Sequence, residues 1–224
     1  MRTMFALRGK ASPKYILHLA AVGQLRAPTA LARRPEGKAT TMVSTAQRWA
    51  LPAALGIAVG LVSWLTLDPL DALVSTFLGM VMIAIAWIDA EHFIIPDVLS
   101  LPSIPVGLAY AWATDEAPPA GLLEHLVAMV VGGLSLYLIR EAYFHYRARE
   151  GLGLGDVKLA LAAGAWAGLS GLGPLLLLAS VLALCWVMVI NARRPGALQG
   201  ATPIAFGVFL APAVWFVWFA GKVC

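Results

Sequence analysis

Two aspartates lie beside long apolar runs. A charged side chain next to the hydrocarbon of a membrane is energetically unfavourable, and such residues usually have a function. Asp89 ends the apolar string "MIAIAWID", and Asp156 follows the glycine-rich string "GLGLG" and opens another apolar run. A pair of carboxylates that holds one proton can hydrolyse a peptide bond without a metal ion or a Ser or Cys nucleophile. The ionised member accepts a proton from the attacking water, and the protonated member donates one to the carbonyl oxygen.

A purely structural role is the alternative for each acid taken alone. Asp156 could serve as the N-cap of the helix that follows it, because Asp is among the residues preferred there. Asp89 suits such a role less well, because an acid at the C-terminus of a helix opposes the helix dipole. Asp97 suits it best, because Pro96 and Asp97 together form a sound helix start. If the acids only cap helices, replacing Asp89 by Asn leaves function intact.

The glycines before Asp156 are the second chemical feature of this stretch. Gly151, Gly153 and Gly155 permit positive φ angles and carry no side chain, so a substrate backbone could approach Asp156 closely. A flexible loop between helices is the alternative. Lys158 lies two residues beyond Asp156, and residues at that spacing do not face each other on a helix. We therefore expect Lys158 to extend toward lipid headgroups and not to neutralise Asp156.

The elements that must position these residues are transmembrane helices. The 224 residues are 60% hydrophobic and only 12% charged, with a mean hydropathy of +0.81, whereas a soluble domain carries about 25% charged residues. We expect an all-α, polytopic membrane protein, a helical bundle in which polar breaks such as "DPLD" separate the spans. The expected helices are 49–67, 72–89, 98–114, 121–140, 156–169, 172–190 and 203–220.

The distribution of positive charge predicts the orientation. With the N-terminus in the cytoplasm, 15 of the 16 Lys and Arg residues lie in cytoplasmic segments or within a turn of them, and Lys222 alone lies outside. We therefore expect seven spans with an N-in/C-out topology. This topology brings Asp89 and Asp156, which are 67 residues apart, to the same cytoplasmic face. From the helix termini we expect Asp156 to be the ionised base and Asp89 to hold the shared proton.

The first 48 residues form a basic segment without a spanning run. Residues 1–40 hold eight Lys or Arg against one Glu, and the string "YILHLAAVGQL" is too short for a bilayer that needs about 20 residues. We expect a disordered cytoplasmic tail over 1–48 and a transmembrane domain over 49–224. Met42 also reads well as a protein start, so residues 1–41 could be dispensable. Because the basic surplus belongs to this short extension, we expect no nucleic-acid partner.

Three strings, in order along the chain, resemble one family of membrane proteases. "GLGD" at 153–156 resembles the GxGD motif of intramembrane aspartyl proteases, and the wider string "GLGLGDVKLALAAGAWAG" resembles that of type IV prepilin peptidases. "IDAEHFIIPDVLSLP" resembles the first aspartate segment of the same family, and "PIAFGVFLAPA" at 203–213 resembles its C-terminal helix. Together the three strings extend the resemblance over residues 72–213.

The resemblance implies an aspartic-type endopeptidase of the bacterial inner (cytoplasmic) membrane that acts in pilus biogenesis and protein secretion. Such an enzyme removes the basic leader from prepilin-like precursors at the cytoplasmic face and requires no cofactor, so its partners would be those precursors and the lipid bilayer. The chain lacks the paired CxxC motifs that many relatives carry, resembles the short form found with tight-adherence pili, and is not expected to methylate its product. The implied catalytic residues are Asp89 and Asp156, and the implied substrate-binding or supporting residues are Gly153, Gly155, Lys158, Pro96 and Asp97.

A proton-coupled membrane transporter is the main alternative, because paired carboxylates can also form a proton relay. Transport sites tend to lie near the middle of the membrane at broken helices, whereas both acids are expected at the cytoplasmic edge.

The four histidines show no metal-ligand spacing, so no metal site is expected. Glu124 and His125 are expected to be solvated near the outer end of their helix.

Small residues recur every four positions in the run that begins at Asp156. They are Ala160, Gly164 and Gly168. Such a stripe allows two helix backbones to approach closely, and we expect it to pack against the helix that bears Asp89.

Overall fold

The structure is a computed structural model and describes residues 45–115, 117–147, 151–193 and 204–223. Every regular element within these ranges is an α-helix, which confirms the all-α, polytopic fold class. Most of the expected tail 1–48 lies outside the described residues. The helices are α2 (Thr45–Thr66), α3 (Pro69–His92), α4 (Asp97–Thr114), α5 (Pro118–Arg147), α6 (Leu154–Arg193) and α7 (Gly207–Val223).

Four of these helices are long and apolar enough to cross a membrane, and they contain the stretches Trp49–Thr66, Pro69–His92, Pro119–Arg147 and Leu154–Arg193. Proline marks two of the helix starts, because Pro69 opens α3 and Pro96 precedes α4. The fixed φ of proline suits the start of a helix, and the N–H that proline lacks has no partner there. The expected bounds agree with the observed ones to within a few residues, except that α5 continues to Arg147 and α6 joins two expected helices.

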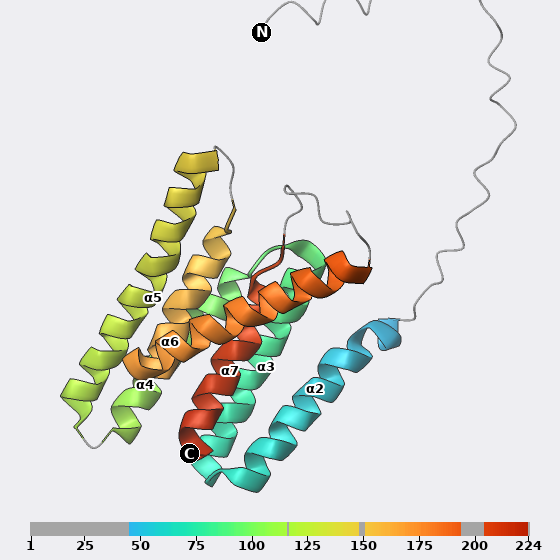
Figure 1. The fold of residues 1–224 in the computed structure, drawn as a ribbon. Helices are drawn as coiled ribbons and strands as arrows, with labels where there is room; N and C mark the ends of the chain where they lie inside the picture. The colour runs from blue at the N-terminus through green and yellow to red at the C-terminus, as the bar shows by residue number, and fades with distance from the viewer. Residues whose placement is uncertain (1–44, 116, 148–150, 194–203, 224) are drawn as a thin grey trace, which may run out of the picture. The chain divides into compact units, whose positions relative to one another are not determined.

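The long helix α6 is broken at Gly168, which has φ 65° and ψ −175°. This left-handed conformation is open to glycine and costly for other residues. Figure 1 shows the second part of α6, coloured orange, leaving the direction of the first part at this point. The break lies at the boundary expected between 156–169 and 172–190, so α6 provides two of the seven expected segments.

Two side chains of α5 take over the hydrogen bonds that the break releases. The ring nitrogen Nδ1 of His125 donates to the carbonyl oxygen of Ala165 at 2.9 Å, and the amide of Leu169 donates to Glu124 Oε1 at 3.1 Å. These two backbone groups would bond to each other in an unbroken helix. Glu124 is exposed, as expected, and His125 is partly buried. The sequence did not predict that both also stabilise the broken ends of α6.

The stripe of small residues packs against α5 and not against α3. A Cβ added at Gly164 would lie 2.3 Å from the carbonyl oxygen of Ala128 on α5, and one added at Gly132 of α5 would lie 2.8 Å from the carbonyl oxygen of Ala160. The two backbones therefore approach more closely than any side chain would allow. The expected partner was wrong, because α3 instead contacts α7 and α4, and it contacts α2 through the hydrogen bond between Ser63 and Ser75.

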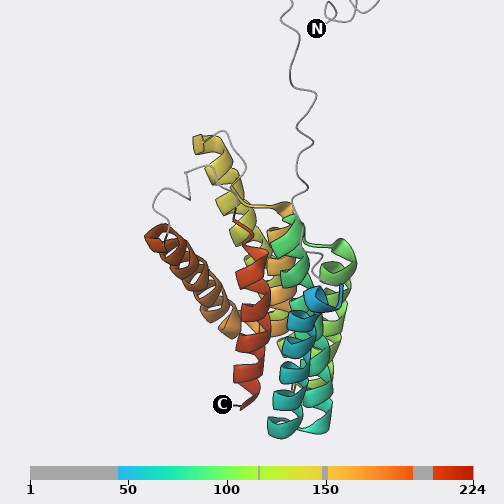
Figure 2. The same ribbon diagram turned by 90° about the vertical axis from the view of Figure 1, so that its right-hand side faces the viewer.

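The helices bring two sets of termini to opposite ends of the bundle. Figures 1 and 2 both show the C-terminal end of α3 on the same side as the starts of α4, α6 and α7, and the end of α7 beside the turn between α2 and α3. We call the first side, with Asp89 and Asp156, the aspartate end. The second side, with Trp218 and Lys222, is the aromatic end. The expected N-in/C-out orientation places the aspartate end in the cytoplasm and stays a prediction.

Candidate active site

A pocket of about 490 Å³ opens at the aspartate end between the end of α3 and the starts of α4 and α6. All seven residues that the sequence singled out line it, although they come from three separate segments. The lining residues are Asp89, Phe93, Ile94, Ile95, Pro96, Asp97, Gly153, Leu154, Gly155, Asp156 and Lys158.

Asp89 lies in the last turn of α3, and its side chain is buried at 5% exposure. The helix ends at Phe93, whose φ of 55° and ψ of 35° are left-handed, and the amide of Phe93 donates to the carbonyl oxygen of Asp89 at 2.9 Å. A bulky residue in this conformation is strained, and such strain is found where the surrounding structure holds a functional site. The sharp ending turns the chain directly into the Ile94–Pro96 wall of the pocket.

Asp156 lies in the first turn of α6 and is buried at 8% exposure. The amide of Gly153 donates to its Oδ2 atom at 3.2 Å. Its Oδ1 atom is buried and has no hydrogen-bond partner in the described part of the chain. A buried polar atom without a partner costs about 1–3 kcal/mol, so this oxygen is available to accept a hydrogen bond from a group that enters the pocket.

The glycines before Asp156 act by their lack of a side chain and not by unusual backbone angles. Among the described glycines, Gly168 has a positive φ, whereas Gly153 and Gly155 do not, so the positive φ angles that these two glycines permit are not used here. A Cβ added at Gly155 would lie 2.9 Å from Ile95 Cβ. Gly155 therefore lets the start of α6 pack against the segment that follows Asp89.

Lys158 and Asp97 form an ion pair across the pocket. Lys158 Nζ lies 2.7 Å and 2.8 Å from the two carboxylate oxygens of Asp97. The expectation that Lys158 extends to lipid headgroups is wrong, because α4 presents an acid within its reach. The prediction that Lys158 does not neutralise Asp156 agrees with this geometry. The ion pair joins the first turns of α4 and α6, next to the two buried aspartates.

The first turn of α7 is a part of the site that the sequence reasoning missed. The amide of Val208 donates to Asp89 Oδ2 at 3.1 Å across 119 residues of sequence. A Cβ added at Gly207 would lie 2.7 Å from the same oxygen. The only signal for this segment was the resemblance of "PIAFGVFLAPA" to a family helix.

This contact also bears on the assignment of the shared proton from helix termini, which stays a prediction. Asp89 was expected to face only the unfavourable C-terminus of its own helix. In the structure it also contacts the N-terminus of α7, where a negative charge is favoured. Asp89 therefore lies between the C-terminus of α3 and the N-terminus of α7, whereas Asp156 lies at the N-terminus of α6, so the helix dipoles differ less at the two acids than expected.

The arrangement suits acid–base chemistry on a bound peptide. Two buried carboxylates line one pocket, and neither is paired with Lys158, whose partner is Asp97. Like charges held in a poorly solvated pocket do not both ionise easily, so such a pair can hold one proton. Among the described residues, no group of three His, Cys, Asp or Glu side chains is arranged to hold a metal ion.

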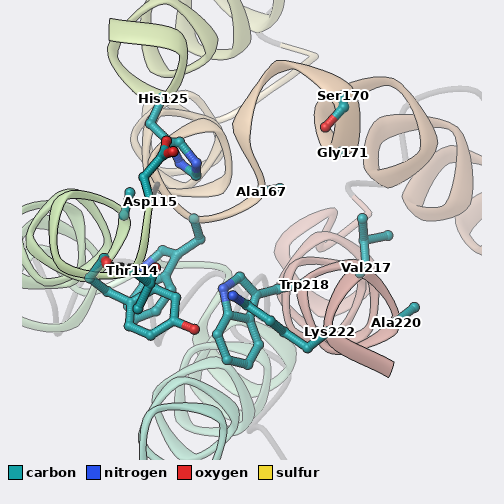
Figure 3. Close-up of a pocket in the computed structure, with 14 residues that line it drawn as sticks. Thr114, Asp115, His125, Ala167, Ser170, Gly171, Val217, Trp218, Ala220 and Lys222 are labelled. Carbon is teal, nitrogen blue, oxygen red and sulfur yellow. Dashed lines mark hydrogen bonds between the residues drawn. The ribbon is translucent and has the colours of Figure 1, made fainter. Parts of the chain in front are cut away.

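The aromatic end holds a second pocket, of about 590 Å³, with a different chemistry. Figure 3 shows Trp218 and Lys222 of α7 on one side of it, with Thr114, Asp115 and His125 across from them. Lys222 Nζ lies 4.9 Å from the centre of the Tyr110 ring and 5.8 Å from that of Trp218. Among the described residues that line this pocket, Asp115 is the one carboxylate, so they do not form a carboxylate pair.

Sequence comparisons find related proteins among bacterial peptidases. The chain is 36% identical over 151 residues to a "Prepilin leader peptidase/N-methyltransferase" of Xanthomonas campestris, in a match that covers 65% of this chain and 49% of the relative. It is 39% identical over 131 residues to the protein of that name from Dickeya chrysanthemi, covering 58% of this chain and 44% of the relative. The corresponding Pseudomonas aeruginosa protein is 36% identical over 135 residues, covering 60% and 44%.

These matches span about half the length of the relatives or less. No solved structure matches the chain significantly. The sequence model of the type IV leader peptidase family matches residues 76–188, a stretch that contains both buried aspartates, the ion pair and the glycine-rich string. Taken together with the helical fold and the two-carboxylate pocket, this match shows that the chain is a multi-pass membrane protein and belongs to the type IV leader peptidase family.

Proposed function

We propose that this protein is an aspartic endopeptidase that removes the leader peptide from prepilin-like precursors, with Asp89 and Asp156 as its catalytic residues. The observation that carries the proposal is the convergence of both carboxylates, buried, in one pocket. Membership in the leader peptidase family supports the type of reaction, and the printed names of the relatives support the class of substrate. The proposal covers proteolysis only and does not extend to methyl transfer.

The proposed mechanism uses the two carboxylates as a base and an acid. The ionised carboxylate takes a proton from a water molecule, and the water oxygen attacks the carbonyl carbon of the scissile peptide bond. The protonated carboxylate donates its proton to the carbonyl oxygen. When the C–N bond breaks, the dyad donates its proton to the leaving nitrogen and takes one back from a hydroxyl of the tetrahedral intermediate, which becomes the product carboxyl group. One shared proton therefore remains on the dyad.

The pocket walls would bind the substrate in an extended form near the two aspartates. Asp97 and Lys158 lie at the pocket, with side chains that are 54% and 37% exposed. Gly153, Gly155 and Pro96 contribute backbone without large side chains. We further propose that the aspartate end faces the cytoplasm of a bacterial inner membrane, because the positive charges of the sequence predict that orientation.

The direct test is cleavage of a prepilin-like precursor by the purified enzyme in detergent or nanodiscs, followed by mass spectrometry of the product. We expect leader removal by the unchanged enzyme and none by Asp89→Asn or Asp156→Asn. The matched control is Asp115→Asn, which changes an acid at the aromatic end and should cleave normally. Full cleavage by either of the first two variants would disprove the proposed roles.

The alternative of a proton-coupled transporter receives no support from the relatives, whose printed names describe peptidases. The geometry also opposes it. Both carboxylates lie in the terminal turns of their helices at one end of the bundle, and the break in α6 at Gly168 lies well away from them in sequence.

A further inference from the structure

The first turn of α7 contacts Asp89 through its backbone. The first amides of a helix have no partner within the helix and must find one elsewhere. The amides of Phe209 and Leu210 both donate to the carbonyl oxygen of Phe206. The amide of Val208 instead donates to Asp89 Oδ2 at 3.1 Å, and the amide of Gly207 faces the same carboxylate.

Gly207 makes this contact possible because it has no side chain. A Cβ at position 207 would lie 2.7 Å from Asp89 Oδ2 and 2.8 Å from Ile95 Cδ1. Both distances are shorter than ordinary van der Waals contact. Any larger residue would therefore push the start of α7 away from Asp89 or force the carboxylate to turn.

Among the described residues that line the pocket, the other charged groups do not compete for this carboxylate. From α4 the charged group is Asp97 and from α6 they are Asp156 and Lys158. Lys158 is held by both oxygens of Asp97. Asp156 is itself an acid and cannot donate while ionised. The backbone of α7 therefore supplies the donors that orient Asp89.

We infer that the first turn of α7, Gly207 and Val208, is the positioning element of the active site: the Val208 amide fixes the orientation of the Asp89 carboxylate, and Gly207 provides the space for it. This inference rests on the proposed catalytic role of Asp89. The segment does not touch the reacting atoms. It acts by holding one oxygen of Asp89, so that the other is presented to the pocket in a single orientation. Small errors in the position of a catalytic group carry a large cost in rate.

A proline at position 208 removes the donor while leaving the rest of the helix start intact. Val208 is in the first turn of α7, where proline is tolerated because no intrahelical bond is lost. The matched control is Val208→Ala, which keeps the amide and removes most of the side chain. We expect Val208→Pro to lower kcat about 10- to 100-fold, which corresponds to the loss of one hydrogen bond to a charged group. KM should stay within about twofold because the substrate contacts are unchanged.

A second pair of variants covers the case in which proline disturbs folding. Gly207→Ala adds a methyl group against Asp89, whereas Gly221→Ala adds one on the same helix where nothing lies within 4 Å. We expect Gly207→Ala to lower kcat with KM preserved, and Gly221→Ala to behave as the unchanged enzyme. The thermal unfolding midpoint of each purified variant in the same detergent identifies any variant that does not fold.

The outcomes separate this inference from the proposed function. If Asp89→Asn is inactive while Val208→Pro and Gly207→Ala match their controls in kcat, the positioning role is disproved and the catalytic role stands. If Asp89→Asn cleaves normally, the proposed function fails first. A loss of kcat in folded Val208→Pro or Gly207→Ala, with Val208→Ala and Gly221→Ala active, supports the inference.

Discussion

The aspartate end and the aromatic end of the bundle hold pockets of similar size but differ in whether their buried polar atoms are hydrogen-bonded. At the aromatic end the Tyr110 hydroxyl donates to Asp71 Oδ1 at 2.6 Å, and Trp166 Nε1 donates to the carbonyl oxygen of Ser103 at 3.0 Å. At the aspartate end Asp156 Oδ1 is buried with no hydrogen-bond partner in the described part of the chain. The comparison shows that the aromatic end satisfies these polar atoms with hydrogen bonds, whereas the aspartate end holds a buried carboxylate oxygen without a partner, as the proposed catalytic role of Asp156 would require.

The aromatic rings show the same contrast on a larger scale. Tyr110, Trp166 and Trp218 contact one another, with ring centres 5.5–6.2 Å apart. They come from α4 and α6, whose first turns line the pocket with the aspartates, and from α7, whose first turn contacts Asp89. Packing of this kind fixes the directions of the three helices. The aromatic end therefore stabilises the frame in which the aspartates must meet.

The largest expected effect separates activity from stability. Asp156→Asn should reduce cleavage by at least about a thousandfold, because the dyad loses a member that exchanges a proton. Its free energy of unfolding should not fall, because the lost carboxylate was buried without a partner for Oδ1. Cleavage kinetics and denaturant titration of the same preparation measure both. A marked loss of stability together with retained activity would reverse the distinction between the two ends.

At the aromatic end, Trp166→Ala should have the opposite effect. The side chain is 2% exposed and contacts both other rings, so its removal should lower the free energy of unfolding by about 3–5 kcal/mol. The folded fraction should still cleave the precursor, since the aspartates lie at the other end. The measurement is cleavage activity per folded molecule. The folded fraction is determined by far-UV circular dichroism, which reports helix content. A variant that is stable but inactive would contradict the separation.

Tyr110→Phe tests the same end with a smaller change. It removes one hydroxyl and its hydrogen bond to a carboxylate, which is worth about 1.5–3 kcal/mol. We expect the unfolding midpoint to fall while kcat and KM stay unchanged. Thr114→Val is a suitable control, because the Thr114 hydroxyl donates within its own helix to the carbonyl oxygen of Tyr110 at 3.0 Å. Equal stability of Tyr110→Phe and the unchanged protein would show that the bond to Asp71 contributes nothing.

The smallest expected effect concerns the ion pair at the aspartate end. Lys158 and Asp97 are partly exposed, so their coupling energy should be at most about 1 kcal/mol and should decrease with salt. A double-mutant cycle with Lys158→Met and Asp97→Asn measures it. The double variant should be about as stable as either single variant. A coupling of several kcal/mol would mean that the aspartate end, too, relies on its polar contacts for stability.

Several features of the site could be predicted because they depend on local sequence. The apolar runs predicted the helices, and α6 breaks at Gly168, close to the boundary expected between 156–169 and 172–190. Asp89 and Asp156 were predicted to share one end because two expected spans, 98–114 and 121–140, lie between them. The chain therefore crosses the membrane twice and returns to the same side. The string around Asp97 predicted a helix start, and α4 begins there.

Other features could not be predicted, because they depend on which helix faces which. The partners of Lys158, Glu124 and His125 lie on other helices, and so does the backbone against which Gly164 packs. Spacing along one chain segment says which of its residues share a face. It does not say which neighbour that face meets.

The amino-acid sequence by itself therefore determined the class of protein, the approximate spans and the two acids at one end, since these depend on hydrophobic length and residue type. The tertiary structure alone decided that the α7 amide meets Asp89, that Asp97 takes Lys158 and that α5 completes the broken α6. The physical reason is that these helices are apolar on most sides. With no single polar face to orient them, their rotation and their partners are settled only when all the helices pack together.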